Sequence, residues 1–412
     1  MKEKLSTDRG STTCRCCGSK NLTEILNLGD HPLPSEYGVS AEHILEAFPL
    51  RLNICENCAL GQIGEYVLPE RIFHKTYPYL SSTSSTWVLH AQNFAINMTS
   101  KLKLNKNSLV VEVASNDGYL LSEFANLGIP VLGIEPAENV ANIARSKGVS
   151  TISNFFGESV ASEIVINNGH PNLIVANNVF AHVPNMIDFV NGLSTLANDE
   201  TIITIENPSF STLMNNGFFD TIYHEHYSYL SAHSVKEIAS SVGLNLFHID
   251  QLMTHGGSNR YWLSKTKKIN DSTFKVLQEE TNSGLLDPNK WLLFREQVKK
   301  TIEDFRKWLS EKEKSGSNII GYGAAHKGNT FLNAVGPISK KIKYVVDASP
   351  EKHGRFLPGS SIPVIPPSSL SEVKPTDVII LPWNIASEIA ETVKDRVPNV
   401  RVWIAQPTMK EL

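Results

Sequence analysis

Residues 109–118 read LVVEVASNDG, and this stretch decides the fold of the middle of the chain. It opens with an apolar run and ends in small and polar residues, a pattern that predicts a buried strand followed by a turn. Residues 118–127 then predict a helix, residues 131–135 (VLGIE) a second strand and residues 137–147 a second helix. Strands that alternate with helices predict a parallel, doubly wound α/β sheet.

The alternation continues toward the C-terminus. Apolar runs at 172–178 (NLIVANN) and 201–207 (TIITIEN) predict two more strands of this sheet. A charged, helix-like stretch follows over 291–314. After it comes a second alternating set, with a strand, glycine turn and helix start at 318–328, strands at 343–349, 377–383 and 400–405, and a helix at 385–393. This set predicts a second α/β domain, and we expect the boundary between Thr266 and Asp287.

Length and composition limit the class of protein. A chain of 412 residues suggests two or three domains, and 41% hydrophobic with 19% charged residues is ample for packed cores. A net charge of −4 argues against a broad nucleic-acid surface. The sequence has no apolar run of about 18 residues, and its start lacks the apolar core of a signal peptide. We therefore expect a cytoplasmic monomer or weak homo-oligomer with no membrane or nucleic-acid partner.

All five cysteines lie near the N-terminus, between Cys14 and Cys58. Cys14 and Cys17 form one CxxC pair and Cys55 and Cys58 a second, separated by 37 residues. Two such pairs can supply four thiolates to one zinc ion and so close its coordination. A catalytic zinc instead keeps one position open. The spacing predicts a structural zinc site, with Cys16 left over. Unmetallated turns or a redox dithiol are the alternatives.

The turn after the first strand of the doubly wound sheet lacks the GxGxxG spacing of a dinucleotide site. Instead, EVASNDG resembles motif I of class I methyltransferases, in which an acid and small residues lead to a closing glycine. Glu135 ends the second strand, where a carboxylate can accept hydrogen bonds from both ribose hydroxyls of a nucleotide cofactor. We expect S-adenosylmethionine (SAM) to be held by Glu112, Ala114, Ser115, Asn116, Asp117, Gly118, Glu135, Pro136 and Asn177.

A second dense group of polar residues, YHEHY, occupies residues 223–227. Its two histidines are two residues apart, whereas the helical zinc pattern requires four. A near-neutral imidazole oriented by a carboxylate suits a general base, and both groups are present here. Asn178 and His182 follow the third strand of the sheet, where class I enzymes place active-site residues. The alternative is an aromatic loop without a catalytic role.

The paired cysteines, EVASNDG, YHEHY, HGGSNR (255–260) and GYGAAHKGNT (321–330) occur in the order found in a known family. With them the chain resembles the nucleotide-sugar C-methyltransferases of deoxysugar pathways, over nearly its whole length. The resemblance implies a small N-terminal zinc module (1–75), a central class I, Rossmann-like methyltransferase domain (76–275) and a C-terminal Rossmann-like domain (276–412). It also implies a substrate class: a dTDP- or GDP-linked 4-keto-deoxysugar that is methylated at C-3′.

The resemblance also implies roles for individual residues. His226 would be the base, and Glu225 and Tyr223 would bind and orient the sugar. Tyr77 matches a tyrosine near the sugar, with Tyr79 close enough to confuse the alignment, and Asn178 and His182 match active-site positions. A ketone acidifies the neighbouring C–H, so a base can form an enolate whose oxygen nearby polar groups stabilise.

The glycine turn at 321–328 would otherwise suggest a dinucleotide site, with Asp347 ending the next strand. We expect instead that the helix start, Lys327 and Asn329 help hold the nucleotide diphosphate, with Arg260 reaching the same group. His326 departs from the small residue expected there. The alternative functions are an O- or N-methyltransferase on a related sugar, an NAD(P)-dependent sugar enzyme, or a non-catalytic zinc-bearing scaffold.

Overall fold

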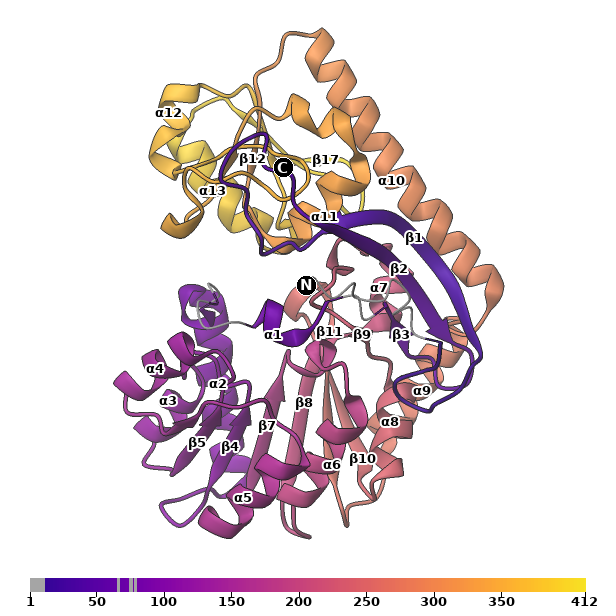
Figure 1. Cartoon of the computed structure of the whole chain (residues 1–412), viewed down its shortest axis with the longest axis vertical. Coiled ribbons are helices and arrows are strands. Elements are labelled where there is room, and N and C mark those ends of the chain that lie inside the picture. The colour runs from indigo at the N-terminus through magenta and orange to yellow at the C-terminus, as the bar shows by residue number, and fades with distance from the viewer. Residues whose placement is uncertain (1–11, 65–66, 74–76, 78–79) are drawn as a thin grey trace, which may run out of the picture.

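The computed structural model describes residues 12–64, 67–73, 77 and 80–412. Its strands form three sheets that follow one another along the chain. One short strand of the first sheet comes from the middle of the chain. In Figure 1 the central sheet lies below, the C-terminal sheet above, and the N-terminal strands run along one side between them. The predicted α/β class with an N-terminal module is confirmed.

The central sheet has the order β10-β11-β8-β7-β4-β5-β6. Its strands are β4 (Val110–Val113), β5 (Val131–Ile134), β6 (Thr151–Ile152), β7 (Leu173–Asn177), β8 (Ile202–Pro208), β10 (Asn245–Leu252) and β11 (Ser258–Ser264). Strands β4 to β8 are mutually parallel, as predicted, but β11 runs antiparallel to β8 and β10 antiparallel to β11. The two added strands were not among those predicted from the sequence, and only β11 runs against the others, because residues 253–257 are too short for a crossover; β10 therefore runs in the same direction as β8.

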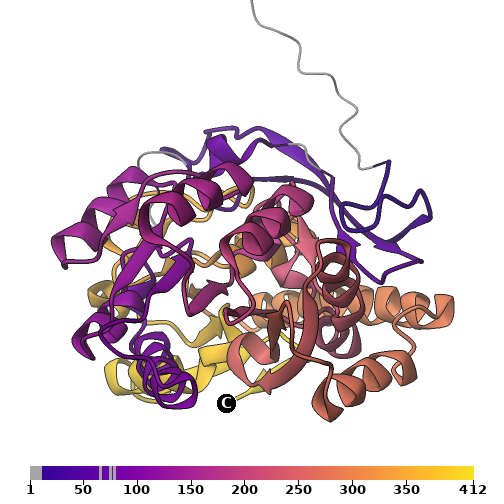
Figure 2. The same cartoon turned by 90° about the horizontal axis from the view of Figure 1, so that it is seen from below.

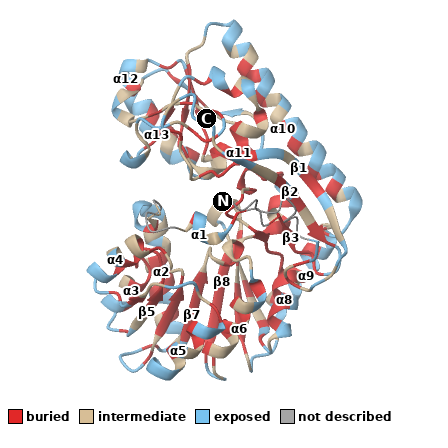
Figure 3. Ribbon diagram, viewed as in Figure 1, coloured by how far each residue is buried: buried red, intermediate tan, exposed pale blue. Residues whose placement is uncertain are grey.

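Helices cover both faces of this sheet, which confirms the doubly wound arrangement. One layer contains α2 (Ser85–Leu102), α3 (Leu121–Asn126) and α4 (Glu138–Ser146), and the other contains α5 (Glu158–Asn168), α6 (Met186–Leu196) and α8 (Ala232–Ser241). Figure 2 shows the two layers from below, and Figure 3 shows the strands between them as almost entirely buried. The carboxyl ends of β4, β5, β7 and β8 therefore open toward the C-terminal part of the chain.

The N-terminal module is built on an antiparallel sheet. Strand β1 (Leu22–Pro32) pairs with β2 (Ala47–Cys55), and β2 pairs with the two-residue β3 (Gly61–Gln62). Strand β3 pairs in turn with β9 (Ser228–Tyr229). Strand β9 comes from the central part of the chain, directly after the YHEHY segment. A strand of the zinc module is thus hydrogen-bonded to the backbone that leaves the predicted catalytic residues.

The predicted second α/β unit is also present. After α9 (Asp271–Asn282) and α10 (Pro288–Lys314), a six-stranded sheet has the order β14-β13-β12-β15-β16-β17. Its elements are β12 (Ile319–Tyr322), α11 (His326–Val335), β13 (Val345–Val346), β14 (Val364–Ile365), α12 (Leu370–Val373), β15 (Asp377–Ile380), α13 (Ala386–Arg396), β16 (Arg401–Ile404) and β17 (Lys410–Glu411). All its pairs are parallel except β16 with β17.

One continuous apolar core joins the three parts. It contains residues of β1 and β2, of α7 (Phe210–Asn216), of α10 and of the C-terminal strands. Arg295 of α10 also donates hydrogen bonds to the carbonyls of Ile25 (2.9 Å) and Glu24 on β1.

The predicted domain limits 1–75, 76–275 and 276–412 stay a prediction. The boundary between residues 275 and 276 falls inside α9.

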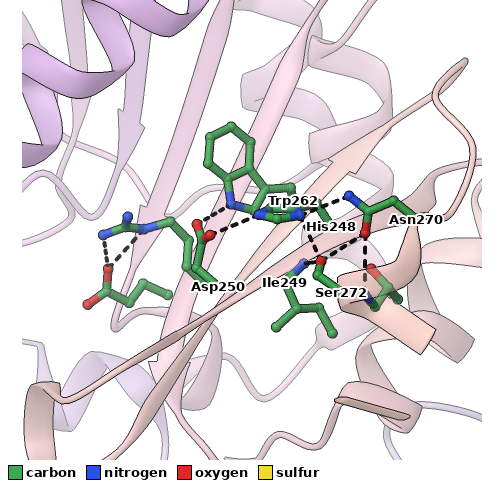
Figure 4. A network of polar contacts seen from close by, with 9 residues as sticks. His248, Ile249, Asp250, Trp262, Asn270 and Ser272 are labelled. Atoms are coloured by element: carbon green, nitrogen blue, oxygen red, sulfur yellow. Dashed lines mark hydrogen bonds and ion pairs between the residues drawn. The ribbon is translucent and has the colours of Figure 1, made fainter. Parts of the chain in front are cut away.

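A polar network fixes the edge of the central sheet to the start of α9 (Figure 4). Asp250 accepts from the indole of Trp262 (2.7 Å) and contacts Nε2 of His248 (2.8 Å). Nδ1 of His248 in turn contacts Ser272 Oγ (2.7 Å) and Asn270 Nδ2 (2.9 Å), and Asn270 is the N-cap of α9.

Among the helices of the described residues, none combines the length and the apolar composition that a membrane span requires.

Candidate active site and metal centre

The four predicted zinc ligands come together. The sulfur atoms of Cys14, Cys17, Cys55 and Cys58 all lie within 4.8 Å of one another, with Cys14 to Cys58 at 3.5 Å and Cys17 to Cys55 at 3.6 Å. Zn–S bonds of about 2.3 Å in a tetrahedron place the sulfurs about 3.8 Å apart, so the set fits zinc. The thiol of Cys16 instead points to the carbonyl of Ser234 (3.3 Å), as its position outside the CxxC spacing indicated.

Each CxxC pair is closed by a tight backbone turn. The amide of Gly18 donates to the carbonyl of Cys14, and the amide of Ala59 to that of Cys55, both over 2.9 Å. Gly18 and Ala59 have positive φ angles of 72° and 58°, which bend the chain back after the second sulfur. With its four ligands enclosed in this way, the site has the form of a structural zinc site.

The turn after β4 adopts an unusual backbone conformation. Ala114, Asn116 and Gly118 have positive φ angles of 55°, 50° and 75°. The amide of Asn116 donates to one oxygen of the Glu135 carboxylate (3.0 Å), and the amide of Ala137 donates to the other (2.9 Å). This carboxylate therefore joins the turns after β4 and β5, and burial raises its pKa to about 7.

Several buried polar atoms in this region have no hydrogen-bond partner among the described residues: Glu112 Oε2, Ser115 Oγ, Asp117 Oδ1 and Asn177 Oδ1. Buried polar groups in proteins are nearly always paired. They lie along β4, in the turn after it and at the end of β7, the edge of a doubly wound sheet that binds ligands. A polar ligand such as SAM would satisfy them, so the predicted residues fit the cofactor.

His226 has a defined protonation state at each ring nitrogen. Its Nδ1 lies 3.0 Å from the carbonyl oxygen of Thr221, which can only accept, so Nδ1 carries the hydrogen. Its Nε2 is then the acceptor for the hydroxyl of Tyr223, also at 3.0 Å. Burial, with the nearby His182 and Lys327, lowers the pKa of His226 well below its ordinary value. The imidazole is therefore neutral at physiological pH.

Glu225 does not orient His226, contrary to the expectation from YHEHY. Its carboxylate lies 3.4 Å from Nδ1 of His326 on α11, and its second oxygen has no partner among the described residues. Its backbone carbonyl accepts from Nδ1 of His182 (2.7 Å). The group that orients the His226 ring is the backbone carbonyl of Thr221. Glu225 links the central part of the chain to the C-terminal part.

Of the other predicted active-site residues, His182 contacts His226 directly. Its ring stands edge-on to that of His226, with centroids 4.7 Å apart. Asn178 directly follows β7 and has a positive φ of 52°. The ring of Tyr77 packs on Phe73 (5.4 Å), which in turn packs on His182 (5.6 Å). Tyr79 lies outside the described residues.

Lys327 reaches this group from the first turn of α11. Its ammonium nitrogen is shielded from solvent, has no hydrogen-bond partner among the described residues and lies 5.2 Å from the Trp383 ring centroid. Burial lowers its pKa, and the nearby Asp220 opposes that effect. Asp220 accepts from the Trp383 indole (2.8 Å). An unpaired ammonium beside a helix N-terminus is suited to an anion.

Two predicted substrate residues are used elsewhere. The guanidinium of Arg260 pairs with the fully buried Glu206 at 2.6 and 3.2 Å, so the structure corrects the expectation that it reaches a diphosphate. The amide nitrogen of Asn329 donates to the carbonyl of Pro34 (3.0 Å), and its side chain is buried. Asn329 therefore attaches α11 to the N-terminal module through its amide nitrogen, while its Oδ1 has no hydrogen-bond partner among the described residues.

Sequence reasoning missed the group around Glu206 at the carboxyl end of β8. Its carboxylate contacts His90 (3.0 Å) and Thr254 (3.2 Å) as well as Arg260. Burial alone would raise the pKa of Glu206, but His90 and Arg260 hold it below its ordinary value. The rule that predicted Glu135, an acid at a strand end, could have indicated Glu206 as well.

Three family models match the chain in succession. They are described as "Putative zinc binding domain" (residues 14–73), "Methyltransferase domain" (87–249) and "C-methyltransferase C-terminal domain" (253–405). Together with the site, they define the chain as a SAM-dependent methyltransferase. It is of the kind that combines a zinc-binding domain with a C-methyltransferase C-terminal domain.

A curated relative agrees with this composition. C-methyltransferase NovU of Streptomyces niveus is 29% identical over 394 residues, which cover 94% of this chain and 93% of the relative.

Two solved methyltransferase structures resemble part of the chain. Magnesium protoporphyrin IX methyltransferase of Synechocystis PCC 6803 is 12% identical, with 43% of this chain and 83% of that chain covered and a TM-score of 0.35. A methyltransferase of Thermotoga maritima is 14% identical, with 48% and 100% covered and a TM-score of 0.35.

Proposed function

We propose that this enzyme methylates a carbon next to the ketone of a nucleotide-linked 4-keto-deoxysugar, with a dTDP or GDP carrier and C-3′ as the acceptor carbon. The observation that carries the proposal is the neutral imidazole of His226. Its lone pair is at Nε2, and its other nitrogen is fixed on Thr221. A methyl acceptor on oxygen or nitrogen already has a lone pair, whereas a carbon acceptor must first lose a proton to a base.

His226 then acts as that base. Its Nε2 takes the proton from C-3′, and the C–H electrons form the C-3′–C-4′ double bond while the ketone π electrons move to oxygen. The Tyr223 hydroxyl, now bonded to Nε2, is placed to turn toward the enolate oxygen, and the ring of His182 lies beside that of His226. Asn178 is a further candidate donor to this oxygen. Electrostatic stabilisation of such an oxyanion by fixed donors is typically the largest contribution to catalysis.

SAM supplies the electrophilic methyl group. In this proposal the carboxylate of Glu135 holds the cofactor ribose, and the unpaired polar atoms of Glu112, Ser115, Asp117 and Asn177 complete the hydrogen bonds. The left-handed backbone at Ala114, Asn116 and Gly118 brings main-chain groups close to the cofactor. Pro136 follows Glu135 and leads into α4.

The nucleotide diphosphate lies against the start of α11. The unpaired ammonium of Lys327 supplies positive charge, and the backbone amides of the helix start add to it. Asp347 follows β13, and its carboxylate accepts from the amides of Ala324 (2.7 Å) and Ser349 (2.8 Å), much as Glu135 accepts from two amides. Unlike Glu135, it also pairs with the ammonium of Lys352 (3.2 Å), which makes it a poorer acceptor for ribose hydroxyls and favours a nucleotide-sugar over a nicotinamide cofactor in this part of the chain.

The test separates proton removal from methyl transfer. The purified enzyme is incubated in D₂O without SAM, with a panel of dTDP-, GDP- and UDP-linked 4-keto-deoxysugars. Deuterium is expected at the carbon beside the ketone for one carrier, and the gain of one methyl on that carbon once SAM is added. His226→Ala should abolish both, whereas His43→Ala, at an exposed histidine of the N-terminal module, should abolish neither.

The same experiment discriminates the alternatives. Methyl gain on oxygen or nitrogen without deuterium uptake would identify an O- or N-methyltransferase and overturn the enolate mechanism. Absence of SAM binding by calorimetry would identify a non-catalytic scaffold.

A further inference from the structure

Arg15 lies between two of the zinc ligands, Cys14 and Cys17, yet its side chain points toward the active site. Its guanidinium donates to the carbonyl of Tyr227 (2.7 Å) and to that of Ile63 (2.6 Å), and its carbon lies 5.7 Å from the centre of the Tyr227 ring. Tyr227 is the residue directly after His226. One side chain thus spans from the cysteine turn to the backbone next to the base.

The surroundings restrict Arg15 on both sides. Its own amide donates to the side-chain oxygen of Gln62 (3.0 Å), and the side-chain nitrogen of Gln62 donates to the carbonyl of Thr13 (3.1 Å). Gln62 is fully buried and pairs with Ser228 in the β3–β9 ladder. The backbone that carries the guanidinium and the strand that receives it therefore belong to one hydrogen-bonded unit.

Tyr227 is held just as firmly at its far end. Its ring is fully buried, and its hydroxyl donates to the carbonyl of Val67 (2.7 Å). Its carbonyl accepts a second bond, from the amide of Ile63 (3.1 Å). Arg15 supplies the charged donor in this arrangement, and hydrogen bonds to charged donors are about twice as strong as neutral ones.

We propose that Arg15 is a positioning residue for His226, through which the zinc-bound cysteine turn sets the geometry of the catalytic segment. The zinc site is then structural in its ligands but acts on catalysis through this side chain. The reason is geometric: a misplacement of about 1 Å in a reacting group costs about 10²-fold in rate. This inference rests on the proposed role of His226 as the base.

Arg15→Met removes both carbonyl contacts and keeps the apolar stem. Arg15→Lys keeps the charge but can reach one carbonyl. The matched control is Arg295→Met, because Arg295 also donates to two backbone carbonyls of the N-terminal sheet, on β1 and away from the catalytic segment. Zinc content, SAM affinity, hydrogen exchange of residues 223–230 and the kcat and KM of methyl transfer are measured for each variant.

We expect Arg15→Met to keep one zinc per chain and SAM affinity within about twofold, while exchange of residues 223–230 rises about tenfold and kcat falls at least tenfold with little change in KM. Arg15→Lys should be intermediate, and Arg295→Met should match the wild type in kcat and in exchange of this segment.

The inference is overturned if the hydrogen exchange of residues 223–230 and the kcat of Arg15→Met stay at wild-type values. It is also overturned if both Arg15 variants lose zinc or fail to fold, or if Arg295→Met lowers kcat equally. The exchange measurement needs no substrate, so it stands apart from any failure of the proposed reaction.

Discussion

The hydroxyl of Tyr223 lies 3.0 Å from Nε2 of His226, with their ring centroids 4.1 Å apart. The phenol therefore occupies the one lone pair of the imidazole that can take a proton. In the proposed reaction, the substrate C–H would displace this hydroxyl or pass its proton through it. In either case the phenol would be left beside the charge that forms on the substrate.

Tyr223→Phe is expected to lower kcat by about 10²-fold, the size of a typical general acid–base contribution. SAM affinity should not change, because the phenol is not part of the turns after β4 and β5. Steady-state kinetics and calorimetry test this. Tyr261→Phe is the control, since it removes another buried phenol, hydrogen-bonded to Asn259 (3.3 Å) on β11. Wild-type kcat in the Tyr223 variant would exclude the role.

Cys17→Ser should lose zinc, whereas Cys16→Ser should retain one zinc per chain. The reason is that the sulfur of Cys17 faces that of Cys55, while the thiol of Cys16 points to the carbonyl of Ser234. Atomic emission measurement of the purified variants gives the result. Zinc loss in both variants, or in neither, would contradict the assignment of the ligands.

Glu135→Gln should weaken SAM binding by about 10- to 100-fold. A carboxylate accepts from the amides of Asn116 and Ala137 with both oxygens, whereas a carboxamide presents a donor to one of them. A hydrogen bond to a charged group contributes about 1.5–3 kcal/mol, and about 1.4 kcal/mol is tenfold in affinity. Calorimetry with SAM measures the change. Glu138→Gln, three residues further on and exposed, should bind SAM like the wild type.

His224 should make stability fall as the pH falls. Burial lowers its pKa to about 4, with the nearby His31 adding to the effect, and in the unfolded chain a histidine has a pKa of about 6.5. Above pH 6.5 both states are neutral and the group contributes nothing. Below it the unfolded state binds the proton first, and by pH 5.5 this removes about 1.4 kcal/mol from the free energy of unfolding.

His224→Gln removes that titration while a side-chain donor toward the carbonyl of Phe48 remains (3.1 Å from Nε2 of the histidine). Urea unfolding at pH 8 and pH 5.5 should show the stability gap between wild type and variant shifting by about 1.4 kcal/mol in favour of the variant. A gap that does not depend on pH would mean that His224 is not held neutral.

Arg260→Met should destabilise the fold by about 3–5 kcal/mol, because it leaves the carboxylate of Glu206 buried without its main partner. The double variant Glu206→Gln with Arg260→Met should recover part of that loss. Denaturation measurements on the wild type and both variants test this. If Arg260 instead binds the diphosphate, the single variant would keep its stability and show a raised KM for the nucleotide-sugar.

Strand-end reasoning predicted part of the site because it depends only on local pattern. Glu135 and Asn177 follow apolar runs, and the carboxyl ends of parallel strands meet at one edge of a sheet. The same reasoning could not pair Glu206 with Arg260, which lie 54 residues apart and meet because β11 turns back antiparallel onto β8. Nor could it indicate that Thr221 orients His226, since the direction of a carbonyl depends on the folded loop.

The sequence by itself determined the two α/β units and the four zinc ligands, because periodicity and the spacing of cysteines are local and survive without knowledge of the fold. The class of chemistry came from the resemblance of its ordered motifs to a known family. Only the tertiary structure decided which groups meet. It places β9 on the zinc module, Arg15 on the carbonyl of Tyr227, and Glu225 beside His326 rather than His226. These contacts join residues up to 212 positions apart, so they follow from how the three parts pack and not from any segment alone.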